Sequence, residues 1–257
     1  MTDRPSFRLY FWPHRALYLG HSPKHNPHRH HAAQICVSLG RPLRFRTDGV
    51  SHWSVAQAVL IPPHSLHQLD SGEAPILALY LEPESDDYPI SKATMGVRSL
   101  PLRKAQFDRL RALHAGGVGV AAAWEVCAAV LGVSGQSKDY RLERDARIRL
   151  LVEEIRSHPG RVFTAEKLAE MVNLSPSRMS HLFKAQVGVP VRQFVIWSRL
   201  RVVIEQALRG STLTAAAHDA GFADAAHMSR AFRQMFGFPP SSLFSARVSD
   251  QVSIMNS

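Results

Sequence analysis

The sequence predicts an α+β protein of two domains: an antiparallel β-barrel of the jelly-roll type followed by helices, and then an all-α domain. Residues 1–90 contain short apolar runs separated by Pro, Gly, Asp and Ser, which is typical of an all-β domain. Residues 168–243 contain an internal repeat with helical periodicity, which is typical of a duplicated supersecondary unit. A chain of 257 residues is long enough for two such domains, each with its own core.

The N-terminal domain is expected to span residues 1–90 and to form a small barrel or jelly roll. Its expected strands are Ala16–Leu19, Ile35–Leu39, Leu43–Phe45, Ala58–Ile61 and Ile76–Leu81. Residues 91–133 follow as a helical element, with helices predicted over 102–114 and 118–131. Residues 134–142 are polar and contain Gly and Ser, so they are the expected linker to a C-terminal domain over 143–248.

The repeat becomes visible when its first copy is shifted forward by 49 positions. The matched pairs are Met179 and Met228, Ser180 and Ser229, Phe183 and Phe232, Gly188 and Gly237, and Pro190 and Pro239. Each copy has the pattern of a short helix, a turn and a second helix with one apolar stripe, which is the helix-turn-helix arrangement. The opposite face of each second helix is polar and basic.

Local capping residues predict where the helices of the first copy begin and end. Thr164 is the expected N-cap of the short helix, and Ser175 followed by Pro176 starts the second helix. Gly188 ends that helix at a position where the left-handed conformation is favoured.

A long helix over 191–208 is expected to join the two copies. At about 1.5 Å per residue it is about 27 Å long, which is the order needed to set two helices in major grooves about 34 Å apart. The second copy has its short helix over 213–220 and its next N-cap at Asp224, with a turn one residue longer than in the first copy.

The segment Ala217-x-x-x-Gly221-Phe222, followed by Phe232-Arg233-x-x-Phe236-Gly237-x-Pro239, resembles the C-terminal signature of the arabinose-regulator (AraC/XylS) transcription factors. The resemblance is strong across the repeat and much weaker before it. It implies two DNA-binding helix-turn-helix units joined by a linker helix. It also implies base contacts from Ser177, Arg178, Ser180 and His181 in the first unit and from Ala226, His227, Ser229 and Arg230 in the second.

The side chains of these helices differ in the contact that they favour. Arg230 is the strongest candidate for direct readout, because a guanidinium can pair bidentately with guanine. Lys184, Arg199 and Arg233 are expected to contact phosphates, which gives affinity without sequence choice. Ala226 departs from the family pattern, where a longer polar residue is common, so the second unit is expected to contact fewer bases. A single basic helix face is usually only a solvated surface, and it is the pair of faces in register that favours DNA.

Histidines are concentrated in the N-terminal domain, where nine of the 14 fall before residue 70. His28-x-His30-x-x-x-Gln34, with Gly40, and later Pro63-x-x-x-His67 resemble the two halves of the cupin motif. In cupins the matching positions, two His, a Glu and a third His, often bind a divalent metal inside the barrel. Here Gln34 takes the place of the Glu.

Two interpretations of these histidines stay open. Imidazoles suit zinc, iron, copper or nickel, so His28, His30 and His67 are candidate metal ligands. Alternatively, these residues and Gln34 line an effector pocket that holds no metal. We expect no obligatory cofactor, with a divalent metal in the barrel as the alternative.

Composition limits the class of protein further. The net charge of +10 favours a polyanionic partner such as DNA. Two cysteines, Cys36 and Cys127, are too few for a disulfide framework, and the N-terminus carries no signal peptide, so a reducing, cytoplasmic setting is expected. Residues 115–133 are weakly apolar and include Glu125, so we expect a buried helix or a subunit contact rather than a membrane span.

The function favoured by these observations is a DNA-binding transcriptional regulator, and not an enzyme, that responds to a small effector in the N-terminal barrel. Promoter DNA, the effector, a second copy of the chain and RNA polymerase are its expected partners, with the helices of residues 91–133 as the dimerisation element. One alternative is a metal-dependent cupin enzyme with an accessory DNA-binding tail, against which Gln34 argues. Another is a non-specific architectural DNA binder.

Overall fold

The structure, a computed structural model, describes residues 7–12, 14–47, 50–83, 96–116, 118–132, 145–244 and 252–254. The chain divides into two compact units, Met1–Tyr140 with Phe236–Phe238 and Asp250–Ser257, and Arg141–Met235 with Pro239–Ser249. The first contains antiparallel sheets and the second contains helices, so the predicted fold class is confirmed. The predicted linker over 134–142 lies outside the described residues.

Two sheets form the framework of the first unit. The larger has the order β10-β1-β2-β8-β3-β6-β9, and the smaller has the order β5-β4-β7. Their strands are β1 (Arg8–Trp12), β2 (Arg15–His21), β3 (Ala33–Ser38), β4 (Leu43–Thr47), β5 (Ser54–Ala56), β6 (Ala58–Ile61), β7 (His67–Asp70), β8 (Pro75–Leu81), β9 (Arg98–Ser99) and β10 (Val252–Ile254). The pairing is antiparallel except between β1 and β10.

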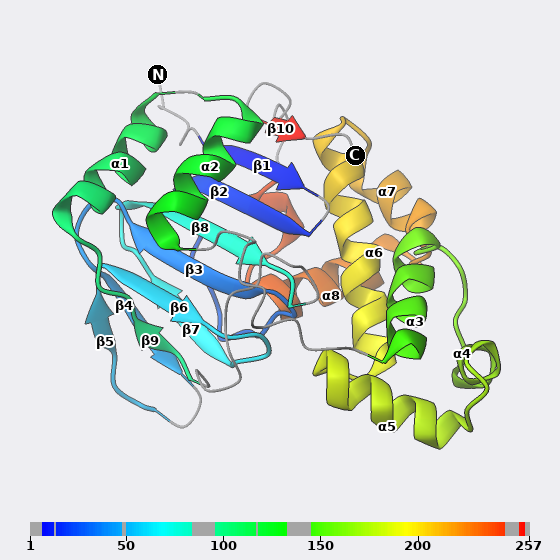
Figure 1. The fold of residues 1–257 in the computed structure, drawn as a ribbon. Helices are drawn as coiled ribbons and strands as arrows, with labels where there is room; N and C mark the ends of the chain where they lie inside the picture. The colour runs from blue at the N-terminus through cyan, green and yellow to red at the C-terminus, as the bar shows by residue number, and fades with distance from the viewer. Residues whose placement is uncertain are drawn as a thin grey trace. The chain divides into compact units, whose positions relative to one another are not determined.

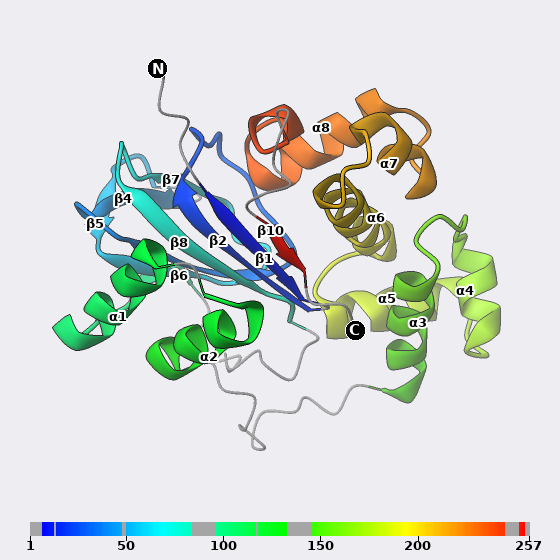
Figure 2. The ribbon, with the colours of Figure 1, turned by 90° about the horizontal axis from the view of Figure 1, so that it is seen from above.

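Both faces of the central strands of the larger sheet are buried, which explains why β6 and β8 are almost continuous apolar runs. Successive strand residues point to opposite faces, and so Ile35 and Val37 join one apolar cluster while Cys36 joins the other. The first cluster lies under α1 (Lys104–Ala115) and α2 (Val120–Leu131), which cover one face of the sheet (Figures 1 and 2). The second cluster includes Leu43 and Leu69 of the smaller sheet.

The two helices of the first unit match the prediction to within two residues at each end. Leu110 and Leu113 of α1 and Cys127 of α2 are buried in the same cluster as strand residues. The helical element is therefore part of the core of this unit. Cys36 and Cys127 are both buried free thiols.

The second unit contains six α-helices among its described residues. They are α3 (Ala146–Ser157), α4 (Ala165–Met171), α5 (Pro176–Val187), α6 (Val191–Leu208), α7 (Leu213–Asp219) and α8 (Ala225–Phe236), with a short 3-10 turn at Pro240–Ser242. Helices α4 and α5 form the first helix-turn-helix unit and α7 and α8 form the second. Helix α6 runs between them (Figures 1 and 2). The linker helix has the predicted bounds.

The predicted capping residues form the hydrogen bonds expected of them. Thr164 Oγ1 accepts from the backbone N–H of Lys167 at 3.3 Å, and Ser175 Oγ accepts from that of Arg178 at 3.3 Å. Asp224 Oδ1 accepts from the N–H of His227 at 2.6 Å. These bonds satisfy donors that have no partner inside a helix. The second turn is one residue longer than the first, as predicted.

The apolar stripe of each second helix is buried, as its periodicity predicts. Met179 and Phe183 of α5 are fully buried, and so are Met228 and Phe232 of α8. The ring of Phe183 meets that of Phe194 in α6 edge to face, with centroids 5.6 Å apart. Burial of each such side chain contributes about 1.5–3 kcal/mol, and it leaves the opposite face of the helix toward solvent. Among the described residues no helix is both long enough and apolar enough to cross a membrane.

Candidate nucleic-acid interface and histidine cluster

The polar face of α5 is open to solvent. The residues predicted to contact bases, Ser177, Arg178, Ser180 and His181, are all exposed, and so is Lys184 one turn further along. Within the described part of the chain, Lys184 makes no ion pair with an acidic side chain. Its ammonium group is therefore available to a phosphate.

The corresponding face of α8 offers fewer polar groups. Ala226, Arg230 and Arg233 are exposed, whereas His227 and Ser229 are only half-exposed. The imidazole of His227 packs edge to face on the ring of Phe222, with centroids 5.3 Å apart. Arg230 is thus the exposed side chain of α8 that is best suited to hydrogen bonding with a base edge.

Both helix-turn-helix units line one groove of about 1050 Å³ within the helical unit. The first contributes Ser180, His181 and Lys184; helix α6 contributes Arg192, Ile196 and Arg199; and the second contributes His218, Phe222 and His227. No acidic side chain is among the residues that line it. Because the two units share this surface, both second helices can face the same ligand.

Arg192 and His218 were missed by the sequence analysis. Arg192 is exposed on the first turn of the linker helix. Its position in the 18-residue helix does not predict the groove, because residues of five helices, α4 to α8, line the groove.

Arg199 has a structural role in the same unit. Its Nε donates to the carbonyl of Pro159 at 3.0 Å and its Nη2 donates to that of Arg161 at 3.2 Å. These bonds hold the loop between α3 and α4 against α6. The predicted phosphate contact of Arg199 stays a prediction, and it must coexist with these two bonds.

The same loop also meets the turn of the second unit. Gly221 lies between α7 and α8 with φ +81°, and a Cβ there would come within 2.9 Å of Cα and O of Gly160. A Cβ on Gly160 would come within 3.0 Å of the carbonyl of Asp219. The two backbones are therefore in direct contact, which fixes the second turn relative to the loop that enters the first unit.

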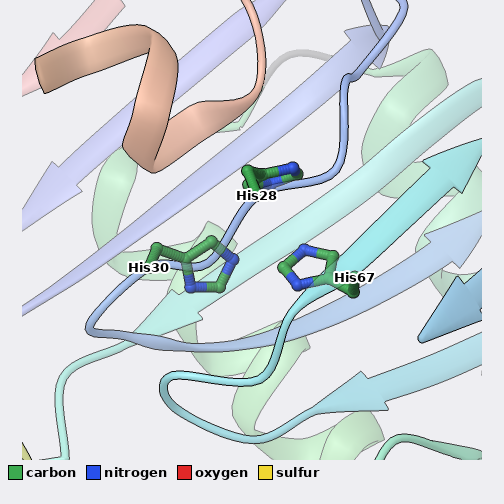
Figure 3. Close-up of side chains that lie close together, drawn as sticks. All are labelled: His28, His30 and His67. Carbon is green, nitrogen blue, oxygen red and sulfur yellow. The ribbon is translucent and has the colours of Figure 1, made fainter. Parts of the chain in front are cut away.

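The histidines singled out by spacing come together in the first unit. The backbones of His28 and His67 pair through two hydrogen bonds of 3.0 Å each, and His64 N–H donates to the carbonyl of His30 at 2.9 Å. The rings of His28, His30 and His67 point toward one another (Figure 3), with a nitrogen from each ring within 4.8 Å of the others. All three side chains are buried, at 3%, 2% and 1% exposure.

Burial keeps these imidazoles neutral. Loss of hydration, with the mutual influence of the neighbouring histidines, lowers the pKa of His28 to about 3. Burial likewise lowers the pKa of His30 to about 4 and that of His67 well below the usual value for histidine. A neutral imidazole is the form that binds a metal ion.

Gln34 joins the cluster from strand β3. Its Oε1 lies 3.1 Å from His30 Nε2, and its amide nitrogen donates to the hydroxyl of Tyr80 at 3.2 Å. Tyr80 was missed by the sequence analysis. It lies opposite Gln34 in the pairing of β3 with β8, a register that no local pattern in either strand specifies.

The helical unit is therefore a domain with two helix-turn-helix units. The family described as "Helix-turn-helix domain" matches residues 168–246. Curated relatives include the arabinose operon regulatory protein of Salmonella typhimurium, 32% identical over 102 residues, and an AraC-like transcription regulator of Streptomyces lividans, 31% identical over 83 residues. The matches cover 38% and 32% of this chain.

The helical domain is therefore similar to those of AraC-type regulators, which confirms the predicted resemblance. Both are named as regulators and neither as an enzyme, in agreement with the prediction. The chain spans only about a third of their length, 35% and 27% respectively.

Solved structures match the chain over both units. An apo form of ToxT K231A from Vibrio cholerae aligns with a TM-score of 0.62 at 11% identity, over 94% of this chain and 96% of that one. ToxT with a bound unsaturated fatty acid aligns with a TM-score of 0.59 at 12% identity, over 95% and 96%. At this identity the match shows that the fold is shared.

Proposed function

We propose that this protein is a sequence-specific DNA-binding transcriptional regulator that responds to a small-molecule effector held in its β-sheet unit. The observation that carries the proposal is the groove of the helical unit. Residues of both helix-turn-helix units line the groove, and they include the basic side chain of Lys184. Arg192 of α6 also lines it, and no acidic side chain does. Basic side chains supply the affinity for phosphates, and the polar faces of α5 and α8 supply groups that can read base edges.

The effector site is proposed at His28, His30, Gln34 and His67. These buried polar side chains converge in a unit with large apolar clusters, and such a combination is typical of a small-molecule site. The structure of ToxT with a bound unsaturated fatty acid supports the proposal, because a protein of this fold carries a small molecule. The effector must bind the active and inactive states with different affinity if it is to shift promoter occupancy.

The remaining partners belong to the same proposal. Helices α1 and α2 form the proposed contact with a second copy of the chain, since their outer faces are exposed beside the sheet. RNA polymerase is the proposed partner at the promoter. The cytoplasm is the proposed site of action, where thiols such as Cys36 and Cys127 stay reduced.

Selection of bound sequences from a random DNA pool by the full-length protein tests the DNA-binding part. We expect an enriched motif with two half-sites about one helical turn, or 10–10.5 base pairs, apart. Binding without any enrichment would instead indicate a non-specific architectural protein. The control is a double variant with Arg230→Ala and Lys184→Ala, which we expect to enrich no motif. Both side chains are exposed, so their loss leaves the core intact.

The effector part is tested on the selected operator. Genome-wide mapping of bound promoters names the regulated pathway, and its intermediates are then added to a gel-shift titration. We expect one of them to change operator affinity in the wild type and not in a Gln34→Leu variant. An equal response in both proteins would place the effector elsewhere.

A further inference from the structure

The tautomer of each clustered histidine is fixed by its backbone surroundings. Nδ1 of His28 lies 2.8 Å from the carbonyl of Asn26, Nδ1 of His30 lies 2.6 Å from that of Ala32, and Nδ1 of His67 lies 2.9 Å from that of Ser65. A carbonyl can only accept, so each Nδ1 carries the proton. Each neutral ring therefore keeps a lone pair on Nε2. This is the arrangement in which histidine binds a metal, with the other ring nitrogen donating to the backbone.

Among the described residues, one of these three Nε2 atoms is buried without a partner. Nε2 of His67 is buried and has no hydrogen-bond partner among the described residues. A buried polar atom of this kind is costly unless a ligand meets it. One nitrogen from each of the three rings lies within 4.8 Å of the other two, so small side-chain movements would bring all three within reach of one ion.

Gln34 adds a fourth acceptor. Its Oε1 lies 3.1 Å from His30 Nε2, and since that nitrogen carries no proton, two lone pairs face each other. A separation of 3.1 Å allows one cation to contact both atoms at about 2.1 Å. The opposite face of the amide is satisfied, because its nitrogen donates to Tyr80 at 3.2 Å.

We propose that His28, His30 and His67 bind one divalent transition-metal ion through Nε2, and that Gln34 completes the set through its amide oxygen. Without the ion, the side-chain amide of Gln34 rotates by about 180°. Its N–H then donates to His30, and its oxygen accepts from the hydroxyl of Tyr80. Imidazole and amide donors suit zinc, cobalt, nickel or copper, whereas calcium and magnesium prefer carboxylates.

The proposal concerns the site that the proposed function assigns to the effector, and it makes the ion part of that site. Metal binding is measured on the full-length protein without DNA. If the protein selects an operator but takes up no metal, the proposed function stands and the metal site is wrong. If it takes up metal but selects no operator, the metal site stands and the proposed function is wrong.

Titration of the chelator-treated protein with Co²⁺, followed by its visible spectrum and by elemental analysis, tests the proposal. We expect one ion per chain. His67→Ala is expected to weaken binding by about 100-fold or more, because even groups that only orient a ligand contribute about 10–100-fold. His52→Ala is the matched control in the same unit, because His52 is exposed and lies outside the cluster. The affinity of this variant for Co²⁺ should equal that of the wild type.

Two variants at Gln34 test the fourth ligand without removing a histidine. Gln34→Leu is expected to bind about 10-fold or more weakly. Gln34→Glu is expected to bind about 10-fold or more tightly, because a carboxylate adds a charge beside the ion. Both should shift the visible bands of bound Co²⁺.

Absence of stoichiometric metal in the wild type, or equal affinity of His67→Ala and His52→Ala, would overturn the site. Unchanged affinity and spectra in both Gln34 variants would overturn the role of Gln34. If circular dichroism shows that His67→Ala is unfolded, the two Gln34 variants decide the question.

Discussion

Replacing Gly221 with alanine is expected to destabilise the helical unit by about 2–5 kcal/mol. The first contribution is conformational: φ at this residue is +81°, and a side chain in the left-handed region costs about 1–2 kcal/mol. The second is steric: the new Cβ would lie 2.9 Å from Cα and O of Gly160, and overpacking of this kind costs about 1–3 kcal/mol. Neither backbone can retreat easily, because Arg199 ties the neighbouring residues Pro159 and Arg161 to α6.

Gly210 provides the control for this prediction. Its φ is +94°, and a Cβ there would meet nothing within 4 Å. Gly210→Ala should therefore carry only the conformational cost of about 1–2 kcal/mol. Urea denaturation of both full-length variants, followed by the emission of the buried Trp197 in α6, measures the difference. Equal losses of stability would show that the contact between residues 160 and 221 does not constrain the second turn, and the reasoning would fail.

Three further predictions concern the proposed interface and its caps. Arg230→Ala should weaken binding to the selected operator by about 1–3 kcal/mol, with little effect on random DNA, as measured by competition gel shifts. Lys184→Ala should weaken binding to all sequences and reduce the slope of log K against log salt by about 1, and an unchanged slope would exclude a phosphate contact. Ser175→Ala should lower the free energy of unfolding by about 1 kcal/mol through loss of the cap, with Ser177→Ala as the exposed control that keeps it.

The helices were predictable because the forces that fix their ends are local. A hydroxyl at Ser175, a proline after it and a glycine at 188 specify one helix within a few residues of sequence. The linker helix over 191–208 was also predicted to the residue, although no side chain caps its N-terminus. The contact between Gly160 and Gly221 joins residues far apart in the chain, and nothing in either neighbourhood predicts it.

The sheets were only partly predictable. Five apolar runs became strands, and β1 carries the same kind of run at Leu9–Trp12, so the pattern itself would have predicted it. The order of the strands could not be predicted from the sequence. Strand β8 lies between β2 and β3, so it pairs with strands that are far from it in the chain. The histidines were found because their sequence resembles the cupin motif. Tyr80 was not, because only the register of β3 and β8 brings it to Gln34.

The two helix-turn-helix units have the same order of helices, but their second helices present different side chains to a DNA ligand. Helix α5 presents four exposed polar or charged side chains at its base-contact positions. Helix α8 presents a methyl group at Ala226 and a half-buried imidazole at His227, which packs against Phe222, so Arg230 is the side chain of α8 that we propose to contact a base. One guanidinium can specify about one base pair, and Arg233 beside it adds affinity without choice. The selected motif should therefore have one half-site with several fixed positions and another dominated by a single G·C pair. Two equally informative half-sites would show that His227 leaves Phe222 when DNA binds.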